Sequence, residues 1–246
     1  LTKEEQETIK KQMEERSKTL RKNKELNDAF NAGMTAKQAQ QWDAAVQSFE
    51  KAVEIDPEQH VIWAQLADTY ARVSDVKTGA EKEAAVEKAI SSYQKVVELK
   101  PDDAAYHNNF ALVLAKAGRF EDAETELERA ATINPPGAGQ YYYNRGAVLL
   151  NSGSTEQSGV AFKRAIEADP NYALAHFQYG MFLLSQAKIG EDGSIVPVEG
   201  TKESLEKYLA LDPNGPQAES AKGALQSLSG SVEMQYVNPD SQRKKK

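Results

Sequence analysis

One phrase recurs five times along this 246-residue chain and ends in proline each time. In every copy an aromatic residue or Leu is followed three residues later by Ala, Val or Tyr. The copies are SFEKAVEIDP, SYQKVVELKP, ELERAATINP, AFKRAIEADP and SLEKYLALDP, which end at Pro57, Pro101, Pro135, Pro170 and Pro213. Successive prolines are 44, 34, 35 and 43 residues apart. A period near 34 residues with two insertions predicts stacked helix pairs rather than a single globular core.

Between the prolines, apolar residues follow the spacing of amphipathic helices. After Pro57, a helix would place Trp63, Leu66, Ala67 and Tyr70 on one face, at i, i+3, i+4 and i+7. The corresponding sets in later repeats are His107/Phe110/Ala111/Leu114, Tyr142/Arg145/Gly146/Leu149 and His176/Tyr179/Gly180/Leu183. The chain is therefore predicted to be an all-α solenoid of five antiparallel helix pairs over residues 27–213, closed by a capping helix over 214–229.

These recurring positions resemble the tetratricopeptide repeat family, whose pattern runs aromatic, Leu, Gly or Ala, Tyr, and then Ala, Phe, Ala and Pro. The resemblance spans about Asn27 to Pro213, and eight positions recur in register. It implies a right-handed superhelix whose first helices line a concave inner wall. It also implies a protein-interaction module, without naming the ligand, because one fold serves many unrelated partners.

Segments outside the repeat period are predicted from their composition. Residues 1–26 are densely charged and read as a lead-in helix or linker, with a short coiled coil along Ile9, Met13 and Leu20 as the alternative. The insertion at 75–86 is predicted to lengthen the second helix of its pair, and the insertion at 186–200 to form a small β-hairpin. Residues 230–246 end in four consecutive basic residues and are predicted to be a flexible basic tail.

Composition restricts the classes of function. The net charge of −7 argues against nucleic-acid binding, and no apolar run approaches the ~18 residues of a membrane span. The absence of cysteine excludes disulfides and thiolate sites. The chain starts at Leu1 rather than Met, so a signal peptide or an upstream domain could have been removed. An exported bacterial location and a cytoplasmic one therefore both stay open.

The three histidines are the first candidates for catalysis or metal binding. His107 and His176 occupy the same repeat position as Trp63 and Tyr142, which predicts interhelical packing, and His60 stands alone near a helix start. No two histidines have metal-ligand spacing, and no phosphate loop or nucleophile motif occurs. The prediction is a protein without catalytic activity, metal or cofactor.

A recurring amide is the most informative polar feature. Every repeat places Asn or Gln at one position of its first helix, beside the packing face: Asn31, Gln65, Asn109, Asn144 and Gln178. Because an amide both donates and accepts hydrogen bonds, such a row suits the backbone of an extended peptide. Neighbouring positions facing the same groove include Phe30, Asn108, Tyr143 and Phe177, with Arg72 and Lys116 further along the helices. The competing interpretation is that the amides solvate the wall or bridge adjacent helices.

Two functions are weighed for the chain itself, and a third, regulatory attachment to an enzyme on a missing part of the polypeptide, would be decided by the full-length sequence. The first is a module that binds a protein or peptide in the groove, through the eleven residues just named. Asn109, Arg72 and Lys116 would make only a partial clamp for a carboxylate, since the first repeat has Phe30 and Met34 at the matching positions. The second is a structural or assembly scaffold that self-associates as a homo-oligomer or packs on an upstream domain. A concentration-dependent mass would favour the scaffold.

Overall fold

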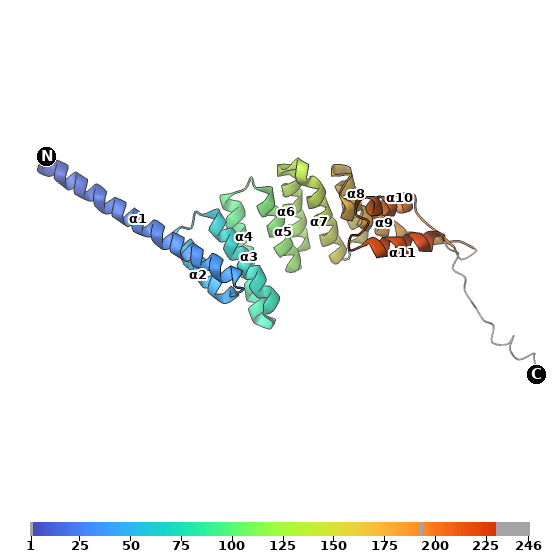
Figure 1. Ribbon diagram of the computed structural model, residues 1–246, viewed down its shortest axis with the longest axis horizontal. Coiled ribbons are helices and arrows are strands. Elements are labelled where there is room, and N and C mark those ends of the chain that lie inside the picture. Colours follow the sequence, from blue (N-terminus) through green and yellow to red (C-terminus); the bar gives the residue numbers. More distant parts are fainter. Residues whose placement is uncertain (1, 192–193, 230–246) are drawn as a thin grey trace, which may run out of the picture. The chain divides into compact units, whose positions relative to one another are not determined.

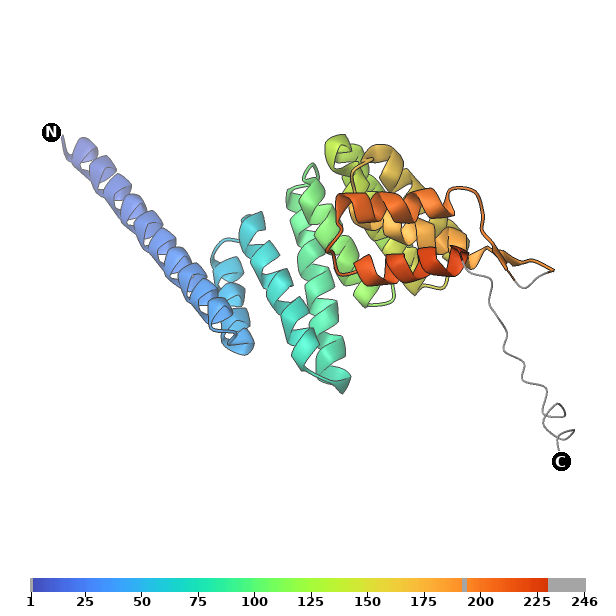
Figure 2. The same cartoon turned by 45° about the vertical axis from the view of Figure 1, so that its right-hand side comes forward.

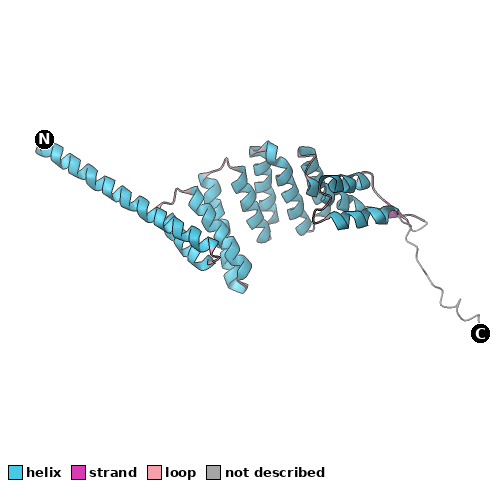
Figure 3. Ribbon diagram, viewed as in Figure 1, coloured by secondary structure: helices cyan, strands magenta, loops and turns pink. Residues whose placement is uncertain are grey.

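The structure, a computed structural model, describes residues 2–191 and 194–229. Within these residues it consists of α-helices, one 3₁₀ turn and a two-stranded ribbon (Figures 1 and 3). The prediction of an all-α array of helix pairs is confirmed. The chain divides into two compact units, residues 1–134 and 135–246, which are described in turn.

The first unit contains three helix pairs. Its helices are α1 (Lys3–Gln38), α2 (Trp42–Ile55), α3 (His60–Val76), α4 (Gly79–Leu99), α5 (Ala104–Lys116) and α6 (Phe120–Ile133). Helices α1 and α2, α3 and α4, and α5 and α6 pack as pairs, and α2 and α4 also contact the following pair. The odd-numbered helices are thus the first helices of the repeats.

The periodic phrase places one large side chain in the middle of each pair. Phe49, Tyr93 and Leu127 are at most 1 % exposed. Gly33 of α1 lies directly against the ring of Phe49, where an added Cβ would come within 2.6 Å of Cε1. The small residue of the pattern is therefore required for the first helix to approach its partner.

In several repeats one position holds a tryptophan or a histidine, and its ring nitrogen forms a hydrogen bond to the carbonyl of the preceding repeat's proline. Trp63 donates from Nε1 to the carbonyl of Pro57 at 2.8 Å, and Nε2 of His107 lies 2.9 Å from the carbonyl of Pro101. In the second unit, Nε2 of His176 lies 2.9 Å from the carbonyl of Pro170. Both histidines are buried, so their prediction as packing residues is confirmed.

The insertion at 75–86 lengthens both helices of the second pair. Helix α3 has 17 residues and α4 has 21, whereas α5 and α6 have 13 and 14. The predicted extension of the second helix is confirmed, and the additional length of α3 had not been predicted.

The charged lead-in continues directly into the first repeat helix. Helix α1 has 36 residues, starts with a capping box between Thr2 and Glu5, and extends well beyond α2 (Figure 2). Every described side chain from residue 2 to residue 25 is exposed. Its buried residues are Ala29, Gly33 and Ala36, which lie in the part that packs on α2.

The second unit holds two helix pairs and a final helix. Its elements are the 3₁₀ turn η1 (Pro135–Gly137), α7 (Ala138–Asn151), α8 (Thr155–Ala168), α9 (Ala173–Ser185), α10 (Thr201–Leu211) and α11 (Ala218–Ser229). Phe162 and Leu205 fill the centres of the pairs. Helix α11 packs Ala218, Ala221 and Ala224 onto Phe177, Leu205 and Tyr208, so it covers the end of the apolar core.

The second insertion forms the predicted hairpin. Strands β1 (Lys188–Ile189) and β2 (Ile195–Val196) pair antiparallel, with Ile189 opposite Ile195. Residues 192 and 193, between the two strands, lie outside the described residues.

Candidate functional site

The amide row lies on the first helices of the pairs. In the first unit, Asn31 and Asn109 are exposed, whereas Gln65 is half-buried and accepts a hydrogen bond from Nζ of Lys37 at 2.7 Å. In the second unit, Asn144 and Gln178 are both half-buried. Of the amide row in the first unit, only the members on α1 and α5 are therefore exposed to a ligand.

An open pocket of about 370 Å³ lies in the first unit between α1, α3, α4 and α5. Three of the predicted residues, Arg72, Asn109 and Lys116, line it together. Leu112 supplies an apolar surface there, with 46 % of its side chain exposed. The complete lining, called the inner pocket below, is Lys37, Asp68, Ala71, Arg72, Asp75, Tyr93, Asn109, Leu112, Val113 and Lys116.

Asp68 joins one half of the charge network in this pocket. Nζ of Lys37 lies 3.6 Å from Asp68, which links α1 to α3. The hydroxyl of Tyr93 donates to the same carboxylate, which brings in α4. Burial of the phenol and the nearby charge of Asp68 raise the pKa of Tyr93, so Tyr93 remains a neutral donor at physiological pH.

Asp75 is the shared partner in the second half of the charge network of the inner pocket. Nζ of Lys116 lies 2.5 Å from Asp75 and also donates to the carbonyl of Ala71 at 3.1 Å. Arg72 lies 3.8 Å from the same carboxylate. Three cations and two carboxylates thus line the pocket, which leaves one excess positive charge. A carboxylate ligand would have to compete with Asp75 for both Arg72 and Lys116.

The remaining predicted residues are placed mainly by packing. Asn108 is 8 % exposed and donates to the side chain of Asn109 at 3.3 Å, and Phe30 is half-buried with its ring 5.9 Å from Phe49. In the second unit, Phe177 is 6 % exposed against Tyr208, and half-buried Tyr143 packs between Phe162 and Tyr172. Asn108 and Phe177 therefore present little surface to a ligand.

Sequence reasoning missed Lys37, Asp75 and Tyr93 as members of the inner pocket. Lys37 lies in the last turn of α1, and its long side chain reaches α3, 28 residues later in the sequence. Asp75 belongs to the insertion. The only available signal was the extra length of the second pair, which brings one further turn of α3 beside α5.

The residues at 2–191 and 194–229 contain no cluster of three His, Asp or Glu side chains arranged to hold a metal ion. In the same part of the chain, no helix combines the length and the apolar character that a membrane crossing requires.

Comparison with known proteins identifies the repeat. Models of the tetratricopeptide repeat match residues 29–59, 86–139, 109–173 and 161–192. A small glutamine-rich tetratricopeptide repeat-containing protein 2 from Mycosarcoma maydis is 30 % identical over 83 residues, which cover 34 % of this chain and 23 % of that protein. A Protein STIP1 homolog from Dictyostelium discoideum is 31 % identical over 105 residues, covering 43 % of this chain and 17 % of that protein. The chain thus spans less than a quarter of either relative.

Solved structures share the fold at low sequence identity. MamA has a TM-score of 0.59 at 18 % identity, covering 80 % of this chain and 96 % of its own. YrrB, described as a tetratricopeptide repeat protein with an unusual peptide-binding site, has a TM-score of 0.56 at 20 % identity, covering 84 % and 97 %. PilF from Pseudomonas aeruginosa has a TM-score of 0.56 at 17 % identity, covering 84 % and 90 %.

Proposed function

The chain belongs to the tetratricopeptide repeat family, and we propose that it is a protein-interaction module whose first helices bind an extended or helical segment of a partner protein. The observation that carries this proposal is the inner pocket. It combines an exposed amide, Asn109, with an exposed apolar side chain, Leu112, and a charged rim. YrrB, a protein of the same fold, is described as having a peptide-binding site.

Each part of the inner pocket has a distinct role in this proposal. The amide of Asn109 pairs with the partner's backbone, and Leu112 contacts an apolar side chain. Arg72 and Lys116 supply the excess positive charge. Because a hydrogen bond contributes about 0.5–1.5 kcal/mol net, a few such contacts give a micromolar rather than a nanomolar complex.

Site-specific crosslinking tests the proposal. A photoreactive amino acid at position 112 is expected to capture a partner from the native proteome, and the same group at Ile133 is not. Ile133 is a matched control because it is 37 % exposed on a second helix, α6. Capture should fall when Asn109→Ala is added and be unchanged by Thr132→Ala on α6. Equal capture from positions 112 and 133 would contradict the proposal.

A second candidate function is self-assembly, and one observation favours it. Ile9, Met13 and Leu20 of α1 are 41 %, 68 % and 62 % exposed and lie along one side of the helix. Sedimentation equilibrium at several concentrations tests whether this stripe joins two copies. A dimer that dissociates in Met13→Glu/Leu20→Glu would support a scaffold, and a concentration-independent monomer mass would exclude it.

A further inference from the structure

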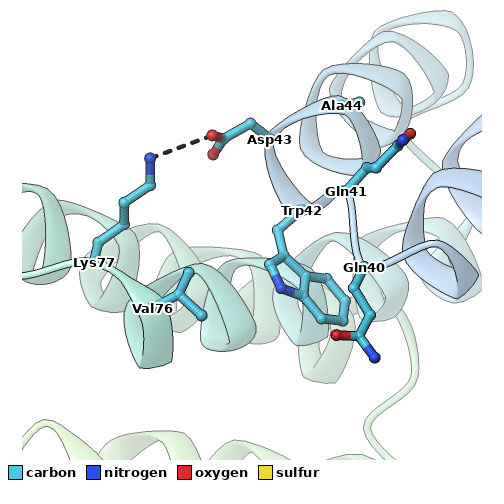
Figure 4. A pocket seen from close by; sticks show the side chains of 7 residues that line it. All are labelled: Gln40, Gln41, Trp42, Asp43, Ala44, Val76 and Lys77. Carbon is cyan, nitrogen blue, oxygen red and sulfur yellow. Dashed lines mark hydrogen bonds and ion pairs between the residues drawn. The ribbon is translucent and has the colours of Figure 1, made fainter.

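A second pocket lies on the first unit, at the turn between α1 and α2 (Figure 4). It has a volume of about 560 Å³, within the ~300–1,000 Å³ range of ligand sites. We propose that this pocket, called the rim pocket below, docks a proline-rich segment in the polyproline II conformation that carries an adjacent basic residue. The rim pocket is lined by Gln40, Gln41, Trp42, Asp43, Ala44, Val76 and Lys77.

The insertion of this chain builds one wall of the rim pocket. Val76 and Lys77 belong to residues 75–86, which lengthen the second pair beyond the repeat period. None of the rim residues lines the inner pocket. The site is therefore a feature of this sequence in addition to the repeat surface, and it can be tested independently of the proposed function.

The apolar part of the pocket suits proline rings. Figure 4 shows the indole of half-buried Trp42 between the side chains of Val76 and Gln40. Val76 is 60 % exposed although it is a large apolar residue. Pro-rich segments dock in aromatic-lined grooves because their polyproline II helix is already formed and little entropy is lost on binding.

The polar part of the pocket suits the carbonyls of such a segment. Polyproline II makes no internal hydrogen bonds, so its carbonyls are free to accept. Within the described residues, Nε1 of Trp42 and the side-chain amides of Gln40 and Gln41 have no hydrogen-bond partner. Gln41 is the N-cap residue of α2, but its side chain makes no capping hydrogen bond. By contrast, the other tryptophan, Trp63, donates to the carbonyl of Pro57.

The backbone of Gln40 gives an independent reason to assign a role to this turn. Its φ is +56°, and the equivalent positions in later pairs hold Gly118 and Gly153 at φ +76° and +82°. The left-handed conformation costs a residue with a side chain more than it costs glycine. The chain thus has a strained glutamine where the repeat uses glycine, and that side chain lines the pocket.

The carboxylates near the rim pocket favour a basic residue next to the prolines of the partner segment. Nζ of Lys77 lies 3.2 Å from Asp43 and 3.7 Å from Glu81. Two carboxylates share one ammonium group, so Asp43, Lys77 and Glu81 together carry one excess negative charge at the edge of the rim pocket. An Arg of the partner would pair with these carboxylates and stack on the indole, whereas an acidic residue would be repelled.

Fluorescence anisotropy of labelled ten-residue peptides tests the proposal on the full chain. The probe has one arginine followed by prolines with a single leucine, and two control peptides replace arginine by glutamate or the prolines by alanines. We expect a micromolar to submillimolar dissociation constant for the probe and at least fivefold weaker binding of each control. Binding weaker than about 1 mM, or equal binding of the alanine peptide, would overturn the proposal.

Protein variants then locate the binding. Val76→Ser and Trp42→Ala should each weaken binding at least fivefold, while Leu112→Ser in the inner pocket should leave it unchanged. Gln40→Gly is the decisive variant. It should raise the midpoint of thermal unfolding, because it relieves backbone strain, and it should also weaken binding of the probe peptide. A Gln40→Gly chain that is stabilised but binds the probe as wild type does, together with unchanged binding by Val76→Ser, would overturn the assignment.

Discussion

The two units use the same repeat positions for different chemistry. In the first unit, the inner faces of α1, α3 and α5 carry a charge network built on Asp68 and Asp75. In the second unit, the positions that correspond to Asp68 hold Ala147 and Met181, which carry no charge. The aromatic residues Tyr143 and Phe177 beside them pack against Phe162 and Tyr208. The periodic positions determine the helix pairs, and the positions beside them are free to differ, so a recognition surface can vary without a change of fold.

The largest expected effect tests whether the two units are independent. Phe162 is 1 % exposed at the centre of the α7–α8 pair, so Phe162→Ala should destabilise the second unit by about 3–5 kcal/mol. Each repeat in such arrays contacts only its neighbours. Native-state hydrogen exchange should therefore show protection lost in α7–α10 and retained in α1–α4. The matched control is Val160→Ala, since Val160 is 62 % exposed on the same helix. Equal loss of protection in α1–α4 would show that the two units unfold together as one cooperative unit.

A buried ion pair should make the stability of the first unit depend on pH near neutrality. Nδ1 of His107 lies 2.5 Å from Glu126, and Ser204 occupies the position of Glu126 opposite His176. The hydrogen bond to Glu126 raises the pKa of His107 against the opposing effect of burial. Because the folded pKa lies above the unfolded value near 6.5, the stabilisation is complete below about pH 6.5 and is lost as the pH rises through the folded pKa.

Glu126→Gln tests this pair. At pH 6 the variant should lose about 1.5–3 kcal/mol of unfolding free energy in the first unit, and the difference from wild type should shrink above pH 8. Hydrogen exchange at several pH values measures it, with exposed Glu121→Gln on α6 as the control. A pH profile shared by wild type and Glu126→Gln would assign the dependence to another group.

A smaller loss of stability, equal in the two units, is expected at the repeat position that holds glycine in both. A Cβ on Gly146 would lie 2.5 Å from the ring of Phe162, as one on Gly33 would lie 2.6 Å from Phe49. Gly33→Ala and Gly146→Ala should each cost about 1–3 kcal/mol by overpacking. Denaturant melts followed unit by unit would measure both, with Gly223→Ala as the control because that position is open. Markedly unequal costs would show that the pairs differ in how far their core can yield.

The sequence predicts the features that depend on local spacing, but not the contacts between side chains of neighbouring helices. The proline period and the central Phe49 and Phe162 positions predict the helix pairs because both depend on local spacing. The contacts between Lys37 and Asp68, or between Lys116 and Asp75, could not be predicted in this way. They depend on which side chains reach across neighbouring helices, 31 and 41 residues away in sequence. The rim pocket could not be predicted for the same reason, because the helical pattern of the insertion does not show that Val76 and Lys77 come to lie beside Trp42.

The smallest expected effect decides whether the charge network of the inner pocket is structural. Lys116 and Asp75 retain 31 % and 47 % side-chain exposure, and partly exposed ion pairs contribute about 0–1 kcal/mol. A double-mutant cycle of Lys116→Ala and Asp75→Ala should therefore give a coupling energy near 0.5 kcal/mol at about 0.1 M salt, which falls toward zero at about 1 M salt as the charges are screened. The cycle should be measured by chemical denaturation of the first unit, with Lys222 and Glu219 on α11 as an exposed comparison pair. A salt-independent coupling above about 1.5 kcal/mol would place these residues among those that stabilise the fold. A weak, screened coupling leaves the network free to exchange its internal partners for those of a bound segment.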